Sequence, residues 1–320
     1  MEEAILIPEA LPERLPAISV ECIAWHGWAD CCRLGNGSVE AVVAPSVGRV
    51  MSLKWMGEEL FWSNPALRGS PHGHPEDEWK NFGGDKCWPA PQSDWPLMQA
   101  LPWPPPAAFD AKPFRAEQTE TGVRLLSEVD PGYGIQVERQ IELLSDAPGM
   151  RIRTVFHKVT GPPVSVSVWT ITQMPEPERV ALLLAGNEDQ QEGYLRLIET
   201  EPHLLRRAGR VLSFARHPRE FVKVGVESLA MAWIGAPAVV RIESLAEEAD
   251  AGSEFPDGGC RSEIYSNPGE LAYVELETLG PLVELKSGES TGRTALYKIG
   301  PRTTADADEE ARRALQTTAR

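Results

Sequence analysis

Two glutamates near the end of the chain are spaced as a pair of carboxylates on one face of a strand. In the segment AYVELETLGPL, the side chains of Tyr273, Glu275 and Glu277 share one face of an extended chain, while Val274 and Leu276 share the other. The two carboxylates then lie about 6.5 to 7 Å apart along the strand. Two like charges this close resist joint ionisation, and partial shielding raises one pKa, which suits a general base or acid. The alternative is a solvated outer face without chemistry.

A second candidate is the stretch WKNFGGDKCWPAPQSDWP, residues 79–96, which is too aromatic for a solvent loop and too broken for a helix or strand. Its indoles offer flat apolar faces, and the adjacent Gly83 and Gly84 permit close approach of the backbone. Hydrogen-bonding groups lie among the indoles. The side chains concerned are Trp79, Asn81, Asp85, Lys86, Trp88, Gln92 and Trp95. Flat faces beside donors and acceptors suit a sugar ring, and a proline-stiffened lid over the core is the alternative.

A third group of polar and aromatic side chains lies on two neighbouring segments within VFHKVTGPPVSVSVWTITQM. Its members are His157, Lys158, Trp169, Thr170, Thr172 and Gln173. The acidic segment HGHPEDEW adds His72 and His74, but an H-x-H pair in an acidic loop is a weak pattern for a metal and predicts a solvated loop. We expect neither a metal nor an organic cofactor, because the sequence also lacks the glycine-rich nucleotide-binding motifs.

Composition restricts the partners and the compartment. The 320 residues include 47 acidic and 31 basic side chains, and a net charge of -16 repels nucleic acid and anionic membrane surfaces. The first 25 residues lack the basic start and apolar run of a secretory signal, and no segment is apolar enough to span a bilayer. The five cysteines are odd in number and form no C-x-x-C pair, which argues against a disulfide framework or zinc site. We therefore predict a reduced, cytoplasmic protein.

The elements that must position these residues are predicted to be strands. From residue 19 onward, short β-branched and aromatic segments alternate with turn signals about every ten residues, which is typical of an all-β sandwich or barrel. In VSVSV, residues 164–168, the valines and serines alternate, which predicts one apolar and one wetted face. We expect an N-terminal extension over residues 1–18, a single domain over 19–303 and a helical tail over 304–320, with the Trp- and Pro-rich residues 64–113 forming a long excursion from the sheets.

Four segments together resemble the galactose mutarotase superfamily of aldose 1-epimerase-like proteins, in a branch without an assigned reaction. They are VGRVMSLKWMGEELFW, NFGGDKCWPAPQSDWP, VWTITQM and YVELETLGPLVELKSGES. The resemblance covers most of residues 35–300. It implies a β-supersandwich of large antiparallel sheets, with a sugar cleft on one concave face.

The resemblance also implies roles for individual residues. Glu277, within Leu-Glu-Thr, matches the late glutamate that is the general base of mutarotases. Trp169 stands roughly where their general acid, a histidine, is expected, which leaves His157 or Lys223 as substitutes. The Asn-Arg pair that holds the sugar has no counterpart at the same spacing; the nearest candidates are Arg49, Asn81, Asp85 and Lys86.

Two functions remain open at this stage. The first is an epimerase or related sugar-active isomerase, with Glu277 as base and His157 or Lys223 as acid. The second is a non-catalytic carbohydrate-binding protein in which a saccharide stacks on Trp79, Trp88 and Trp169. A scaffold that has lost the cleft is a third, lesser possibility. In the first two cases the partner is a small saccharide.

Overall fold

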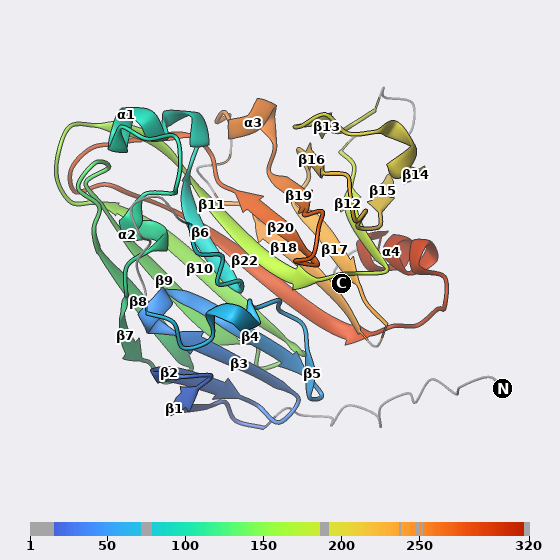
Figure 1. Ribbon diagram of the computed structural model, residues 1–320, viewed down its shortest axis with the longest axis horizontal. Coiled ribbons are helices and arrows are strands. Elements are labelled where there is room, and N and C mark those ends of the chain that lie inside the picture. Colours follow the sequence, from blue (N-terminus) through green and yellow to red (C-terminus); the bar gives the residue numbers. More distant parts are fainter. Residues whose placement is uncertain are drawn as a thin grey trace.

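The protein consists of two large antiparallel sheets that pack face to face (Figure 1). The computed structural model describes residues 16–71, 79–185, 192–236, 238–247, 250 and 252–316. Within these ranges, the first sheet has 12 strands. Ten of them follow the order β1 (Ser19–Trp25), β2 (Trp28–Gly35), β3 (Val39–Ala44), β4 (Arg49–Trp55), β6 (Asp85–Ala90), β11 (Val164–Pro175), β20 (Tyr273–Leu279), β19 (Ser262–Ser266), β16 (Val222–Val226) and β13 (Leu195–Arg196). The short strands β5 (Glu58–Glu59) and β21 (Val283–Leu285) pair with β4 and β11.

The second sheet has 10 strands among the described residues. Their order is β14 (Arg206–Ala208), β15 (Val211–Phe214), β12 (Arg179–Leu183), β17 (Ala230–Ile234), β18 (Ala238–Leu245), β22 (Ser290–Pro301), β10 (Gly149–Lys158), β9 (Ile135–Leu143), β8 (Gly122–Val129) and β7 (Arg115–Gln118). The main hydrophobic core lies between the two sheets and draws on strands of both. The predicted all-β supersandwich is therefore confirmed.

The side chains of β11 alternate between the two faces of the sheet, as predicted, but the face predicted to be polar is more buried than expected. Val164, Val166 and Val168 pack into the core, and Ser165 is exposed. Ser167 is buried, because its hydroxyl donates to the carbonyl of Gly280 at 2.6 Å. On this face of the strand, therefore, Ser165 is exposed to solvent but Ser167 is not.

The Trp- and Pro-rich excursion contains a strand that the sequence did not predict. Residues Asp85–Ala90 form β6, which lies between β4 and β11 in the first sheet. The interpretation of this segment as too broken for a strand is wrong for these six residues. Pro89 was misleading, because proline cannot donate to a ladder and is rare in central strands. The rest of the excursion holds α1 (Trp95–Gln99), α2 (Ala107–Asp110), and the 3-10 turns η2 (Pro65–Leu67) and η3 (Gln92–Asp94).

The two glycines of this segment are required by close backbone packing, as predicted. Gly83 and Gly84 both have positive φ, at 91° and 72°. A β-carbon would lie 2.4 Å from the Trp62 carbonyl oxygen at Gly83 and 2.3 Å from the Val50 carbonyl oxygen at Gly84. These approaches let the chain enter β6 directly against its neighbours.

A buried polar link joins the two sheets. The Asp85 carboxylate on β6 is paired with the Arg139 guanidinium on β9, and both side chains are fully buried. Asp85 Oδ2 also accepts hydrogen bonds from Thr172 Oγ1 and from the Tyr297 hydroxyl, each at 2.7 Å. This side of β6 thus faces the second sheet.

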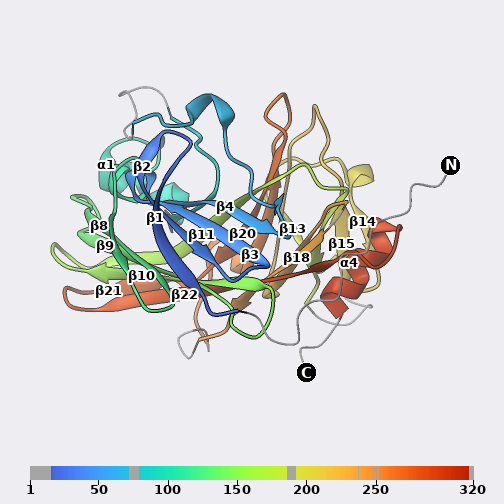
Figure 2. The same ribbon diagram turned by 90° about the horizontal axis from the view of Figure 1, so that it is seen from below.

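The predicted C-terminal helix is present as α4, Ala307–Gln316. It covers the outside of the second sheet, where Ala311 and Leu315 pack against β12, β15, β17 and β18. In Figure 2 it lies at the end of the molecule that holds β14 and β15. The remaining helical segments are α3 (Pro256–Gly259) and the 3-10 turns η1 (Pro45–Val47) and η4 (Pro202–Leu204). No described helix is long and apolar enough to cross a membrane.

Candidate functional site

Neighbouring strands bring several of the predicted residues to the outer face of the first sheet, the face turned away from the second sheet. On β20, Val274 and Leu276 point into the core, so Glu275 and Glu277 point outward. In the ladder of β11 with β20, Gln173 lies opposite Glu275. The tryptophan-rich segment and the acidic strand are thus separated only by β11, which pairs with both (Figure 1).

Glu277 lies at the centre of a compact group that we call the Glu277 cluster: Glu277, Lys223, Glu263 and Trp169. The Trp169 indole donates to Glu277 Oε2 at 2.7 Å, and Lys223 Nζ lies 3.3 Å from the same oxygen. Lys223 Nζ also lies 2.9 Å from Glu263 Oε2 and 4.8 Å from the centre of the Trp169 ring. One ammonium therefore bridges two carboxylates over an indole face.

Burial and neighbouring charges shift the titration of this cluster. Glu277 is 1% exposed, and burial raises its pKa, while Lys223 opposes that shift. Burial raises the pKa of Glu263 in the same way. For Lys223, burial acts to lower the pKa, but the two carboxylates outweigh it and the net pKa is raised. The cluster therefore combines a carboxylate that accepts a proton more readily than usual with a charged ammonium beside it.

A second group, the Glu275 cluster, lies one pleat along β20 and consists of Glu275, Lys86 and Gln173. Glu275 Oε1 is 3.2 Å from Lys86 Nζ and accepts from Gln173 Nε2 at 2.7 Å. Lys86 Nζ lies 4.7 Å from the centre of the Trp88 ring. Burial lowers the pKa of Lys86, and Glu275 opposes that shift. Because Glu275 is 9% exposed and Glu277 less, neither acid belongs to a solvated outer face.

Asp110 is a site residue that the sequence analysis missed. It lies on α2 and accepts from the indoles of Trp79 and Trp88, each at 2.8 Å, and from Arg49 Nη2 at 2.6 Å. Arg49 is fully buried and donates a further bond to the carbonyl of Gly83 at 3.0 Å. Burial lowers the pKa of Arg49, against the attraction of Asp110. Arg49 thus holds the tryptophan-rich segment in position through Asp110.

Five of the ten tryptophans form one continuous aromatic cluster. Trp88 is at its centre, with ring centroids 5.3 Å from Trp169, 6.0 Å from Trp79, 5.7 Å from Trp95 and 5.9 Å from Trp103. Trp95 is fully buried, and its indole donates to the carbonyl of Pro89. Trp103 is 42% exposed. The cluster therefore runs from the Glu277 carboxylate to solvent.

Other predicted residues lie elsewhere. Asp85 points into the core and pairs with Arg139, so it is not on the outer face with its neighbour Lys86. His157 is on β10 in the second sheet; Phe156 beside it packs in the core, so His157 points away from the first sheet. There its Nε2 lies 3.3 Å from Glu138 Oε2. The structure therefore does not bring His157 to the Glu277 cluster.

Asn81 and Tyr273 meet at the edge of the face. The Tyr273 ring lies 4.7 Å from that of Trp62, and Asn81 acts to lower the pKa of the Tyr273 hydroxyl. Burial raises the pKa of Tyr273. Asn81 Oδ1 is buried and accepts no hydrogen bond from the described part of the chain.

No group of three or more His, Cys, Asp or Glu side chains among the described residues is arranged to hold a metal ion. The segment with His72 and His74 lies outside the described residues, so its predicted solvated loop stays a prediction.

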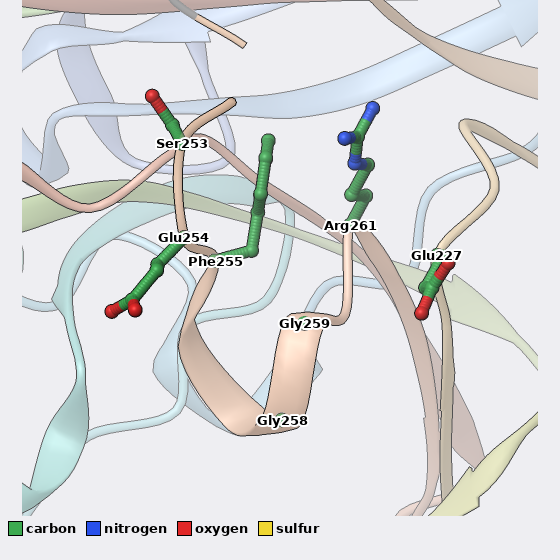
Figure 3. Close-up of a pocket in the computed structure, with 7 residues that line it drawn as sticks. All are labelled: Glu227, Ser253, Glu254, Phe255, Gly258, Gly259 and Arg261. Carbon is green, nitrogen blue, oxygen red and sulfur yellow. The ribbon is translucent and has the colours of Figure 1, made fainter. Parts of the chain in front are cut away.

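A separate cavity of about 430 Å³ lies beside α3 (Figure 3). Its lining includes Phe255 and Arg261, whose guanidinium carbon stands 4.3 Å from the centre of the Phe255 ring. None of the residues predicted for the site lines it. Two of its lining residues adjoin strands of the site, because Glu227 follows β16 and Arg261 precedes β19.

Comparison with solved structures identifies the fold. Neither protein-family models nor curated protein sequences match the chain. A galactose mutarotase-like protein from Lactobacillus casei matches with a TM-score of 0.56 and 9% identity, over 84% of this chain and 100% of its own. An Escherichia coli protein provisionally described as an aldose 1-epimerase matches with a TM-score of 0.55 and 13% identity, over 89% and 99%. A Salmonella typhimurium protein provisionally described as a mutarotase matches with a TM-score of 0.53 and 13% identity, over 93% and 98%. The chain thus has the galactose mutarotase-like fold.

Proposed function

We propose that the protein binds a saccharide on the outer face of the first sheet and interconverts its anomers, as an aldose 1-epimerase does. The observation that carries this proposal is the 3.3 Å approach of Lys223 Nζ to Glu277 Oε2. It joins a carboxylate and an ammonium, which are a base and an acid, within one buried group. Of the two substitutes considered for the missing histidine, only Lys223 is near Glu277.

The proposed reaction opens and recloses the sugar ring by two coupled proton transfers. Glu277 removes the proton from the anomeric hydroxyl, the bond between C1 and the ring oxygen breaks, and Lys223 gives its proton to that oxygen. The resulting aldehyde rotates about the C1–C2 bond. Ring closure then returns one proton to Lys223 and the other from Glu277 to the new hydroxyl, so both side chains recover their starting states.

The coupling between the two groups favours this exchange. The pKa of Lys223 is raised by two carboxylates, which would make it a poor acid in the resting protein. Once Glu277 takes a proton from the sugar, one of these negative charges disappears and the ammonium becomes a stronger acid. The substrate's own proton thus prepares Lys223 for its step.

The surrounding side chains supply groups for holding a saccharide. Trp169, Trp88 and Trp79 offer aromatic surface along the acidic strand, and Glu275 and Tyr273 carry hydrogen-bonding groups beside it. The cations of this face are paired with carboxylates in each cluster. A face on which every cation is paired with a carboxylate suits the uncharged hydroxyl groups of a sugar.

A second function, saccharide binding without turnover, is favoured by one specific observation. The Trp169 indole donates directly to Glu277, whose side chain is nearly completely buried. If this bond persists with ligand bound, Glu277 is a structural acceptor and cannot reach the anomeric hydroxyl.

The test compares Glu277→Gln with wild type in two assays. Anomer interconversion of glucose and galactose is followed by polarimetry or by NMR saturation transfer, and sugar binding by the shift of the thermal midpoint. We expect Glu277→Gln to lower the interconversion rate by roughly 10²–10⁴-fold while the sugar still binds, since one general base contributes about that much. Glu284→Gln, on an exposed position of β21, is the matched control and should behave as wild type.

The outcomes separate the candidates. Binding by wild type without interconversion supports the second function. Interconversion that survives in Glu277→Gln removes Glu277 from the mechanism, and absence of binding by both proteins to a broad panel of sugars refutes the proposal as a whole.

A further inference from the structure

Two of the five cysteines lie directly opposite each other at the edge of the first sheet. Cys22 on β1 and Cys32 on β2 are register partners in the antiparallel hairpin that ends this sheet. Both are free thiols. This pair could not be predicted from the spacing of the cysteines, which matches no disulfide pattern, and Cys31 adjoins Cys32.

Their geometry fits a cross-strand disulfide. Residues directly opposite in an antiparallel pair have α-carbons about 4.5 to 5.5 Å apart, within the range of about 4.4 to 6.8 Å that disulfides span. Side chains of such partners point to the same face of the sheet. For Cys22 and Cys32 this is the face toward the second sheet, since Cys32 and its neighbour Leu34 pack in the main core.

The Gln118 side chain lies beside both cysteines. It comes from β7 of the second sheet and donates to Cys22 Sγ at 2.9 Å. Gln118 also acts to lower the pKa of Cys32, and Cys22 acts to raise it, which fits the register that places the two cysteines opposite each other.

The other three cysteines lack this arrangement. Cys31 points to the opposite face of β2 and packs in a separate apolar cluster, and Cys87 and Cys260 are buried on other strands and loops. Cys22 is exposed, whereas Cys32 is 4% exposed. A reagent in solution can thus reach Cys22 first, with Cys32 positioned behind it.

We propose that Cys22 and Cys32 form a reversible dithiol–disulfide pair that is oxidised by low-molecular-weight disulfides such as oxidised glutathione. The Cys22 thiolate attacks one sulfur of the small disulfide, forming a mixed disulfide and releasing one small thiol. The Cys32 sulfur then attacks Cys22 Sγ, and the second small thiol leaves. Two protein S–H bonds are lost, one S–S bond forms, and the oxidant is reduced to two thiols.

The consequence is local to the end of the sheet. The new bond closes the hairpin between β1 and β2 and fixes β1, which as an edge strand pairs on one side only. Burial raises the pKa of Cys32, so the second step is expected to be the slower one. This inference does not depend on the proposed saccharide function.

The test oxidises the full-length protein with excess oxidised glutathione at mildly alkaline pH and measures the intact mass. We expect the loss of two hydrogens, reversal by dithiothreitol, and a rise of a few degrees in the thermal midpoint of the oxidised form. Chymotrypsin cleaves after Trp25 and Trp28, so the linked peptides should join the one that holds Cys22 to the one that holds Cys31 and Cys32. The same digest of Cys31→Ala assigns the link to Cys32.

Variants make the result specific. Cys31→Ala should still oxidise, whereas Cys22→Ser, a change at an exposed position, should not form the cross-link. Cys32→Ser should stop at a glutathione adduct on Cys22. A stable adduct on Cys22 of the wild type, a link to Cys31, or a disulfide between two chains on a non-reducing gel would overturn the proposal.

Discussion

Replacing Asp85 by asparagine should destabilise the fold rather than weaken sugar binding. Asp85 accepts from Arg139 of the second sheet and from the hydroxyls of Thr172 and Tyr297, and it is fully buried with Arg139. Asparagine keeps the shape but removes the charge, which leaves a buried guanidinium without its counter-ion. Removing one partner of a buried ion pair costs about 3 to 5 kcal/mol. Since about 1.4 kcal/mol is a factor of ten, the ratio of folded to unfolded protein should fall by roughly 10²–10⁴-fold.

The assay is urea unfolding at neutral pH, with Glu309→Gln as the matched control. Glu309 pairs with Arg313 at 2.7 Å on the exposed face of α4, and the loss of such a surface pair costs less than about 1 kcal/mol. The double replacement Asp85→Leu with Arg139→Met should recover much of the stability, because no buried charge is left unpaired. A loss below about 1 kcal/mol in Asp85→Asn, together with weaker sugar binding, would refute the structural role and return Asp85 to the ligand site.

Two further predictions concern pH and backbone packing. The pKa of Glu138 is lowered to about 2, chiefly by the hydrogen bond from Arg124, so its contribution to stability is complete above the ordinary value of 4.5 and is lost as pH falls toward 2. Glu138→Gln should therefore flatten the thermal midpoint against pH between about 4.5 and 2, and an unchanged slope would contradict this assignment. Gly84→Ala should lose more than about 1 kcal/mol in denaturant unfolding, because a β-carbon there meets the Val50 carbonyl at 2.3 Å. Gly57→Ala is its control, since Gly57 also has positive φ but has open space around it, and equal losses in the two variants would show that the close contact is unimportant.

The sheets could be predicted from the sequence because strand signals are local. Alternation in residues 164–168 and turns at regular spacing identify strands without knowledge of their partners. The order of the strands within each sheet could not be predicted in this way. β6, β11 and β20 are neighbours although more than 70 residues separate each from the next, and no local pattern in one strand specifies the other two.

The candidate site was predictable only where its residues lie close together in the sequence. Glu275 and Glu277 were correctly predicted to share a face, because both lie on one strand. Asp85 and Lys86 were assigned together only because β6 was not recognised as a strand, and alternation sends them to opposite faces. Glu263 was missed, although the segment SEIYS alternates in the same way as the acidic strand. No sequence pattern indicated Asp110, since its role comes from partners 22, 31 and 61 residues away along the chain.

The absence of a histidine beside Glu277 does not by itself deprive this face of a proton donor. In the ladder of β19 with β20, Glu263 lies opposite Glu277, and in the next ladder Lys223 lies two residues away from the partner of Glu263. This diagonal step lets one long side chain reach both carboxylates. The Lys223 ammonium lies over the face of the Trp169 ring. The Trp169 indole also donates to Glu277 Oε2, the same oxygen that Lys223 contacts, and so orients it. Under the proposed mechanism the tryptophan and the lysine act as a pair, with the indole orienting the carboxylate and the ammonium supplying the proton. Replacing either residue alone should then lower the rate of anomer interconversion, because the remaining one no longer meets a correctly placed Glu277.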